Sequence, residues 1–164
     1  MLGFSCKQKM LRRRGLAEGQ EDSLNPQSIG SSEPESTHLC PFVNEKFLFH
    51  GTSKQFIKPI YATRGFDWRL AGRANGHSFG MGNYFARDSA YSTRFCIDSR
   101  TLFMVRVLVG DFTAGKPSYL RPPPLNEKDK FGEVYDSCVD NVNTPSMYVT
   151  FEFGQSYPAY LIHF

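Results

Sequence analysis

Two short segments carry residue types that suit the binding of a flat ring with an amide group. They are Phe49-His50-Gly51-Thr52-Ser53 and Gly80-Met81-Gly82-Asn83-Tyr84-Phe85-Ala86. The first offers an imidazole, a peptide unit without a side chain, and hydroxyl groups, all of which form hydrogen bonds. The second allows close backbone approach and then presents aromatic faces. Together the two segments predict a pocket for an amide-bearing ring.

The residues around the first segment predict a strand and a helix that position it. Phe47-Leu48-Phe49 is a short apolar run, typical of a buried strand, that leads directly into His50. Lys54 to Tyr61 is predicted to be a short amphipathic helix that begins after a cap at Thr52 or Ser53. Its apolar residues fall on one face at helical spacing: Phe56, Ile57 and Ile60.

A loop and a second helix flank the other segment. Thr63 to Phe79 contains three glycines, three arginines and no regular period, so it is predicted to be a long loop of the kind that often forms a lid. Asp88 is a suitable cap for a helix that runs to about Phe95. Helical spacing places Ser92 one turn from Asp88 and facing the same way.

The second half of the chain is rich in strand patterns. Leu102 to Val109 is apolar and β-branched, and Glu133 to Val139 is similar. Met147 to Phe153 alternates strictly, which puts its apolar residues on one side of a strand, and Tyr160 to Phe164 is predicted to be the last strand. Helices precede strands without a repeating strand-helix unit, so the predicted fold class is α+β with a largely antiparallel sheet.

The composition indicates one globular domain behind a polar N-terminal region. The chain has 164 residues, 15 of them Phe and 8 Tyr, and an aromatic load of this size favours strands and stacking pockets. Residues Phe4 to Arg14 are predicted to form a basic fragment of one or two helical turns. Gly15 to Glu35 has almost no large apolar residue, which predicts a disordered linker. The predicted division is residues 1–43 as fragment and linker, and 44–164 as the domain.

Charge and cysteine usage limit the classes of partner and compartment. The net charge is +3, and much of it comes from the basic fragment, which is too local to establish nucleic-acid binding. The four cysteines are scattered, without the spacing of a zinc site, so we expect free thiols and no metal. We found no signal peptide and no membrane span, which predicts an intracellular protein of the cytoplasm, the nucleus or both.

A dinucleotide-binding motif of the Rossmann type is the first alternative for the glycine-rich segment. In the pattern G-x-G-x-x-G the sixth position here is Phe85, and an irregular loop precedes the segment instead of a strand. Both differences count against a Rossmann fold. Taken singly, His50 is more often an ordinary core or surface histidine, and Tyr84 and Phe95 are compatible with plain core packing. The combination of His50 with Gly51, Tyr84 and Ser92 at these spacings favours the pocket.

From about Asn44 to its end, the chain resembles the catalytic domain of the poly(ADP-ribose) polymerase family, in its mono-ADP-ribosyltransferase branch. The matching motifs are Phe-His-Gly-Thr at His50, Gly-x-Gly-x-Tyr-Phe-Ala at Tyr84, and Pro-Ser-Met-Tyr-Val at Met147. The resemblance implies an ADP-ribosyltransferase fold, with a mainly antiparallel split sheet and short flanking helices. It also implies NAD+ as co-substrate, protein acceptors that include the chain itself, and a catalytic set of His50, Tyr84 and Met147.

The resemblance further implies a role for each residue of the NAD+ site. His50 would hydrogen-bond a hydroxyl of the adenosine ribose, Tyr84 would stack on the nicotinamide ring, and Phe95 occupies the place of a second stacking tyrosine. The remaining NAD+-binding residues would be Gly51 and Ser92, which clamp the amide group, and Thr52 near the ribose. The segment from Phe66 to Phe79 matches the variable loop beside the donor site.

Met147 decides which reaction the resemblance predicts. Polymerising members have a glutamate there that prepares a ribose hydroxyl for chain growth, and a methionine side chain has no oxygen for that task. We therefore expect the transfer of single ADP-ribose units. Glu152 is the nearest carboxylate in sequence, but strand alternation places it on the opposite face from Met147, toward solvent.

Two other functions stay open at this point. Family catalytic domains have more structured chain before the Phe-His-Gly segment, so this chain looks truncated at its N-terminus. A truncated domain would serve as a catalytically inert binding or interaction module. The basic fragment also leaves nucleic-acid contact open as a third function.

Overall fold

The computed structural model describes residues 39–63, 65–67, 77–129 and 131–164. The two predictions for the N-terminal region, a basic helical fragment and a linker, lie outside the described residues. The described elements follow one another in this order: η2 (Pro41–Val43), β1 (Glu45–Gly51), α2 (Lys54–Thr63), β2 (Asn83–Ala86), α3 (Ser89–Thr93), β3 (Thr101–Leu108), β4 (Phe112–Ala114), β5 (Ser137–Val139), β6 (Met147–Thr150), η4 (Phe153–Gln155) and β7 (Ser156–His163).

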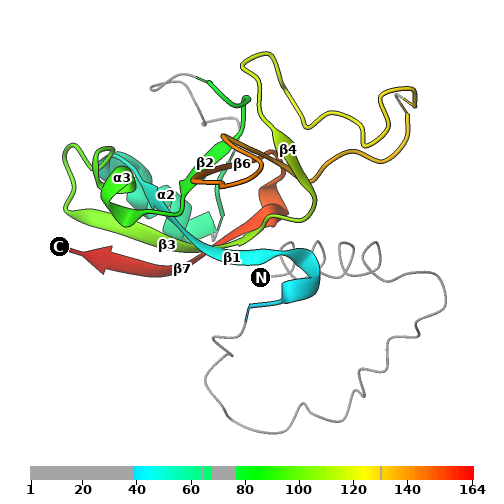
Figure 1. The fold of residues 1–164 in the computed structure, drawn as a ribbon. Helices are drawn as coiled ribbons and strands as arrows, with labels where there is room; N and C mark the ends of the chain where they lie inside the picture. The colour runs from blue at the N-terminus through cyan, green and yellow to red at the C-terminus, as the bar shows by residue number, and fades with distance from the viewer. Residues whose placement is uncertain (1–38, 64, 68–76, 130) are drawn as a thin grey trace, which may run out of the picture.

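The strands form one sheet in the order β4-β5-β6-β2-β1-β3-β7 (Figure 1). All neighbouring pairs are antiparallel except β4 and β5, which are parallel. The longest ladders join β3 to β1 and to β7, and β3 is buried along most of its length. The predicted α+β class with a mainly antiparallel sheet is confirmed.

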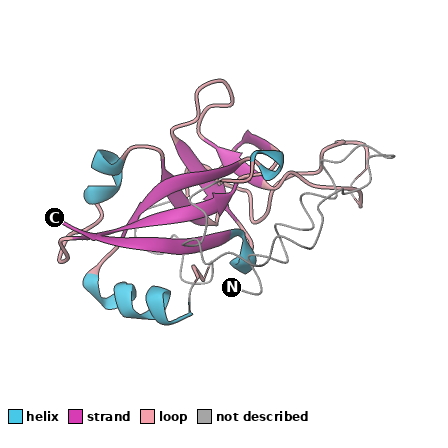
Figure 2. Cartoon of the chain, turned by 90° about the horizontal axis from the view of Figure 1, so that it is seen from below, coloured by secondary structure: helices cyan, strands magenta, loops and turns pink. Residues whose placement is uncertain are grey.

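The hydrophobic core lies on one face of the sheet, which we call the core face. The strands contribute Leu48, Phe85, Phe103, Val105, Val107, Val139 and Tyr148 to it. Phe66, from the segment after α2, packs among them and is 2% exposed. Ile57 and Ile60 of α2 pack against the same cluster, as the helical spacing predicted, whereas Phe56 is exposed. Figure 2 shows the two α-helices on opposite sides of the strands.

The described chain is packed against the sheet from its first residues onward. Cys40 and Val43 bury together with Leu108 of β3. Glu45 adds polar contacts here, because its carboxylate accepts hydrogen bonds from the Cys40 amide and from Arg106 Nε, at 2.8 and 2.7 Å. These contacts join η2 to the central strands.

Several predicted boundaries are wrong, and hydrogen bonds explain why. Glu133 to Val139 is a strand only at Ser137–Val139, because Glu133, Val134 and Tyr135 pair instead with the Pro123–Leu125 loop. Met147 to Phe153 is a strand only to Thr150. The Gln155 side chain accepts the next two backbone amides, at 3.3 and 3.4 Å, and the chain turns into η4.

The last strand and the loop after α2 also differ from expectation. β7 begins at Ser156 instead of Tyr160, because Ser156 to Pro158 already pair with β3. The predicted loop from Thr63 begins inside α2, and Phe66 within it is part of the core. The lid expected of this loop falls mainly on residues 68–76, outside the described residues. Glu152 is exposed, as predicted.

Candidate functional site

The predicted site residues lie where β1 and β2 separate. In the described register these strands form one pair, Phe49 with Ala86, whereas β1 pairs with β3 along its whole length. The pairs that would follow in an antiparallel register, His50 with Phe85 and Gly51 with Tyr84, are not formed. The sheet therefore opens between the end of β1 and the start of β2, which exposes backbone groups that a continuous ladder would occupy.

His50 bridges this opening with its side chain. Its Nδ1 lies 2.8 Å from the carbonyl oxygen of Tyr84, and because a carbonyl only accepts, Nδ1 carries the proton and donates. The ring packs edge-on against Phe66, with centroids 4.8 Å apart, and near Phe85 on the core face. Burial lowers the pKa of His50 below its usual 6.5, and the bond to Tyr84 opposes part of that shift. The neutral imidazole thus keeps Nε2 as a hydrogen-bond acceptor.

Tyr84 is held by its hydroxyl group. The hydroxyl donates to the Gly80 carbonyl at 2.8 Å and accepts from the Phe79 amide at 2.9 Å. Burial raises the pKa of Tyr84, so the phenol stays protonated. The turn that supplies these partners depends on Gly80, whose φ of 124° disfavours a side chain. The hydroxyl is therefore occupied by the backbone, and the half-buried ring is what Tyr84 offers to a ligand.

α3 packs against β1 through a glycine. A Cβ atom at Gly51 would lie 1.9 Å from the carbonyl oxygen of Ser92, so only a glycine permits this approach. The buried Ser92 hydroxyl donates to the Phe49 carbonyl at 3.0 Å. The side chain of Asp88 caps α3 by accepting the Ala90 amide at 2.9 Å, as predicted. The structure thus brings Gly51 and Ser92 into direct contact.

Two further predicted residues flank this contact. α3 ends at Thr93, two residues earlier than predicted, and Phe95 follows in the next turn, where its amide donates to the Ser92 carbonyl at 3.1 Å. Its ring lies 5.6 Å from that of Tyr91. Thr52 directly follows β1, and its carbonyl accepts the Ser99 hydroxyl at 2.9 Å. α2 begins at Lys54, directly after Ser53, as predicted, and the Asp98 side chain accepts the Lys54 amide at 2.8 Å.

Met147 is the first residue of β6 and lies opposite Ala86 of β2. Because side chains alternate along a strand, Met147 and Tyr84 lie on the same face of the sheet, the face that α3 covers next to Gly51. The side chain of His50 lies on the other face, among the core aromatic rings. His50 reaches the Tyr84 backbone across the opening between the strands.

Asp140 is a residue of this region that the sequence analysis missed. Its carboxylate accepts from the amides of Ser146 and Met147, at 2.9 and 3.0 Å, and from the Ser146 hydroxyl at 2.5 Å. Burial alone would raise the pKa of Asp140, but these bonds together lower it. Asp140 thereby fixes the start of β6. An aspartate several residues before a strand is too common a pattern to have revealed this role.

The described residues contain no cluster of three or more histidine, cysteine or acidic side chains that would hold a metal ion. Three cysteines are described as free thiols, and Cys40 and Cys138 among them are buried. Burial raises the pKa of Cys138 to about 11. Among the described helices, none has the length and apolar character that crossing a membrane requires.

Comparisons with known proteins identify the family. Residues 23–133 match the model of the poly(ADP-ribose) polymerase catalytic domain. The chain is 40% identical to protein mono-ADP-ribosyltransferase PARP11 of Mus musculus over 76% of its own length and 43% of that protein. It is 45% identical to protein mono-ADP-ribosyltransferase PARP12 of Homo sapiens, over 99% of this chain and 22% of the relative. The chain therefore spans less than half of these relatives, and it belongs to the poly(ADP-ribose) polymerase catalytic-domain family.

Proposed function

We propose that this chain transfers single ADP-ribose units from NAD+ to protein side chains and releases nicotinamide. The relatives reported above are named protein mono-ADP-ribosyltransferases, and the similarity covers most of this chain. The observation that carries the proposal is the arrangement at the opening between β1 and β2, where a neutral imidazole, a glycine backbone, a buried hydroxyl and an aromatic ring come from adjacent elements.

The candidate site residues suit the ribose and nicotinamide groups of NAD+. Nε2 of His50 is an acceptor suited to a ribose hydroxyl, because the Nδ1 proton is engaged with Tyr84. The Gly51 backbone, which has no side chain to obstruct it, and the Ser92 hydroxyl suit the carboxamide of nicotinamide. The rings of Tyr84 and Phe95 suit its flat faces. Thr52 is placed beside the ribose in this proposal.

The reaction breaks the bond between nicotinamide and ribose and forms a bond from the same ribose carbon to an oxygen or nitrogen of the acceptor. Such a step passes through a state with positive charge on the ribose, as in glycoside hydrolysis. The protein holds the leaving ring and orients the ribose. These tasks require positioning more than covalent chemistry.

Met147 supports transfer of single units. It lies on the same face of the sheet as Tyr84, and its side chain has no oxygen to bind a second ribose hydroxyl. Asp140, the carboxylate next to it, already accepts from Ser146 and from the Met147 amide. A growing chain of ADP-ribose would therefore lack the group that activates its end.

The test is incubation of the full chain with NAD+ labelled in the adenylate phosphate, followed by denaturing gel electrophoresis. We expect a discrete labelled band of the chain itself and of added protein acceptors, lost in His50→Ala and retained in Lys128→Ala, an exposed control. A ladder of long products would contradict single transfer. Absence of label, with retained binding of benzamide, would favour the inert binding module.

We further propose that the protein acts inside the cell, in the cytoplasm or the nucleus. The three free thiols of the described chain support a reducing compartment. Microscopy of a fluorescent fusion tests the compartment. Nucleic-acid binding through the basic fragment is a secondary proposal, supported by its five lysines and arginines alone: Lys7, Lys9, Arg12, Arg13 and Arg14. Loss of salt-dependent RNA binding on deleting residues 1–14 tests it.

A further inference from the structure

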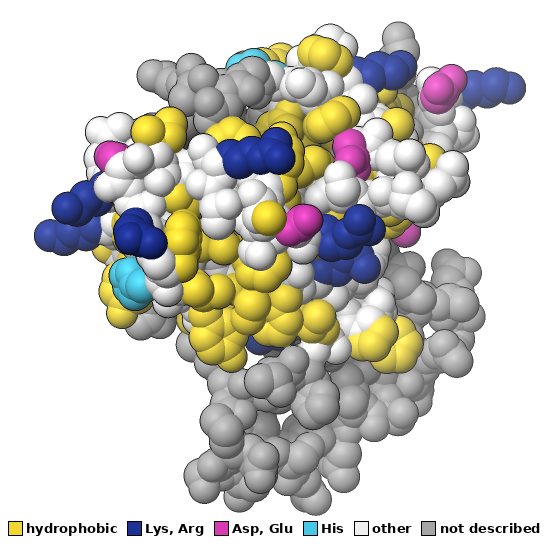
Figure 3. Space-filling model, turned by 60° about the vertical axis from the view of Figure 1, so that its left-hand side comes forward, with side chains coloured by type: hydrophobic (Ala, Val, Ile, Leu, Met, Phe, Trp, Pro, Cys, Tyr) yellow, Lys and Arg dark blue, Asp and Glu magenta, His cyan; other side chains and the backbone are white. Residues whose placement is uncertain are grey.

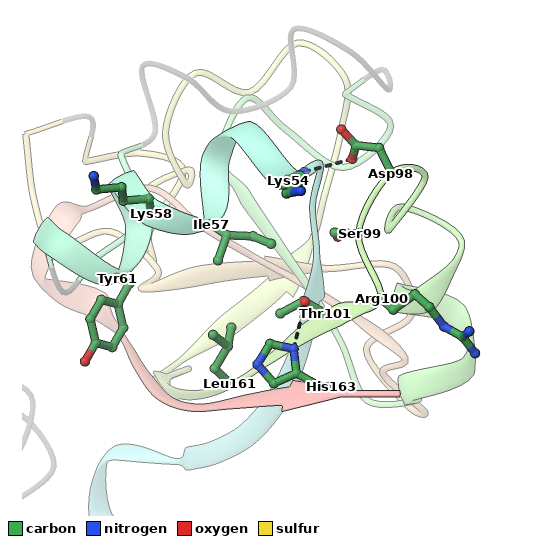
Figure 4. Close-up of a pocket in the computed structure, with 10 residues that line it drawn as sticks. All are labelled: Lys54, Ile57, Lys58, Tyr61, Asp98, Ser99, Arg100, Thr101, Leu161 and His163. Atoms are coloured by element: carbon green, nitrogen blue, oxygen red, sulfur yellow. Dashed lines mark hydrogen bonds between the residues drawn. The ribbon is translucent and has the colours of Figure 1, made fainter.

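A groove of about 520 Å³ lies between α2 and the C-terminal part of β7 (Figure 4). None of the residues proposed for NAD+ lines this groove. α2 contributes Lys54, Ile57, Lys58 and Tyr61, which fall on one helix face because they are spaced by three or four residues. The opposite wall is Leu161 of β7 and its neighbours. α2 thus presents two cations and two apolar side chains to one surface.

The groove has an apolar floor and a basic rim. Figure 4 shows Ile57 and Leu161 in the space between the helix and the strand, with Lys58 and Arg100 extending to opposite sides. Tyr61 is 69% exposed and offers a large apolar surface at one end. The acidic lining residue, Asp98, already accepts the Lys54 backbone amide. Asp98 keeps its negative charge, but Lys54, Lys58 and Arg100 outnumber it, so the groove presents a net positive charge to a ligand.

β7 adds a second feature, the open edge of the sheet. It is the last strand in the sheet order, and among the described residues its one strand neighbour is β3. β7 carries a proline, Pro158, and a register shift next to it, but both precede the last part of the strand. In that part Tyr160, Leu161 and Ile162 are 48%, 36% and 36% exposed, and no charged residue interrupts them. Proteins usually protect an exposed edge with charges, prolines or bulges, because an unprotected edge pairs with other strands.

Hydrophobic side chains are also visible on the molecular surface at this end of the molecule (Figure 3). Hydrophobic side chains gather on the face that includes this end of the molecule, with Lys, Arg and His side chains beside them (Figure 3). The histidine at this end of β7, His163, has its Nδ1 3.1 Å from the Thr101 hydroxyl. That contact holds the end of β7 against β3.

We propose that this groove binds an extended acidic peptide segment of a partner protein, which adds as a strand to the Tyr160–His163 edge. A groove between a helix and an edge strand is the arrangement in which added strands are recognised, with main-chain bonds for affinity and alternate side chains for specificity. Every second side chain of the added strand would face the groove. Glutamates there would meet Lys54, Lys58 and Arg100, and their methylene groups would pack on Leu161. The apolar neighbours would face the opposite side of the sheet, next to Tyr160 and Ile162.

Two other occupants fit these features less well. A nucleic acid matches the basic rim but has no backbone that pairs with a strand edge. A second copy of this chain would bring a second basic rim next to the first, and the like charges would repel. The combination of edge, apolar floor and cations favours an acidic peptide.

The probe is a short fluorescein-labelled peptide of alternating glutamate and valine, titrated with the full chain and followed by fluorescence anisotropy. We expect saturable binding that weakens at high salt, because charge contacts on a surface are screened. A peptide with lysine in place of glutamate should not bind. A peptide methylated on alternate backbone nitrogens should bind at least about tenfold more weakly, which equals a loss of about 1.4 kcal/mol.

Variants locate the binding to the groove. Lys54→Glu combined with Lys58→Glu should weaken binding by at least about tenfold, again about 1.4 kcal/mol. Lys128→Glu, a single charge reversal at an exposed residue that does not line the groove, should have no effect. Circular dichroism of each variant establishes that it is folded.

Three outcomes would overturn the proposal. They are equal binding of the methylated peptide, tighter binding of a single-stranded RNA that competes for the same groove, or dimerisation of the chain that is abolished by the same lysine variants. Because peptide binding needs no NAD+, its failure would leave the proposed transferase activity untouched.

Discussion

The contact between Gly51 and Ser92 makes a sharp prediction for Gly51→Ala. The added Cβ would lie 1.9 Å from the Ser92 carbonyl oxygen and 2.8 Å from its carbon. Non-bonded carbon and oxygen atoms stay about 3.3 Å apart even in close contacts, so α3 must move by more than about 1 Å. The Ser92 carbonyl is backbone and accepts the Phe95 amide at 3.1 Å, so it has no rotamer by which to avoid the clash.

Two opposing effects determine how much Gly51→Ala changes the free energy of unfolding. Overpacking a well-filled contact destabilises a protein by about 1–3 kcal/mol. Replacing a glycine by alanine also lowers the conformational entropy of the unfolded chain, which stabilises the protein by about 0.4–1 kcal/mol. We expect a net loss of about 1–2 kcal/mol in the free energy of unfolding, or a fall in Tm of about 3–8 °C for a domain of this size. Urea denaturation and calorimetric melting measure both quantities.

Binding of benzamide, a mimic of the nicotinamide ring, should suffer more than stability does. The shift of α3 displaces the Ser92 hydroxyl from the Phe49 carbonyl and the opening beside it, so affinity should fall at least about tenfold. The matched control is Gly132→Ala, where the new Cβ meets the flexible carboxylate of Asp129, which can move aside. If Gly51→Ala melts and binds like the control, the proposed clamp between α3 and β1 is refuted.

Three further predictions concern titrating and buried polar groups. Asp140→Asn should lower the free energy of unfolding by about 1 kcal/mol at pH 7, because charge-assisted hydrogen bonds are lost. The lowered pKa of Asp140 means that this stabilisation is present above the usual 3.8 and disappears as pH falls through the native value, so urea midpoints of variant and wild type should converge in acid. For His50, the lowered native pKa means that the unfolded state takes up the proton first below pH 6.5. The wild type should therefore lose stability relative to His50→Gln as pH falls through that range, and a constant difference would refute the assignment. Gln155→Leu should lower the free energy of unfolding by about 2–4 kcal/mol, because it removes the buried hydrogen bonds that Nε2 donates to the carbonyls of Leu108 and Asp136, at 3.1 and 2.6 Å. A Tm within a degree of wild type would contradict this.

Elements with a strong local pattern could be predicted from the sequence. The apolar run before His50 is a strand, Asp88 caps α3, and Ile57 packs on the core, because burial of a periodic face decides each case. The strand ends could not be predicted. β6 stops at Thr150 because the side chain of Gln155 captures the amides that would continue it, a contact that alternating residues do not reveal.

The sequence alone determined which chemical groups are available: an imidazole, a backbone without a side chain, a hydroxyl, aromatic rings and a methionine. Only the tertiary structure decided how they are placed. The register of β1, β2 and β6 puts the side chain of His50 on the core face and those of Tyr84 and Met147 on the other. The physical reason is that pairing between strands far apart in the chain depends on the whole core. No single segment encodes the opening between β1 and β2, across which His50 contacts the Tyr84 carbonyl.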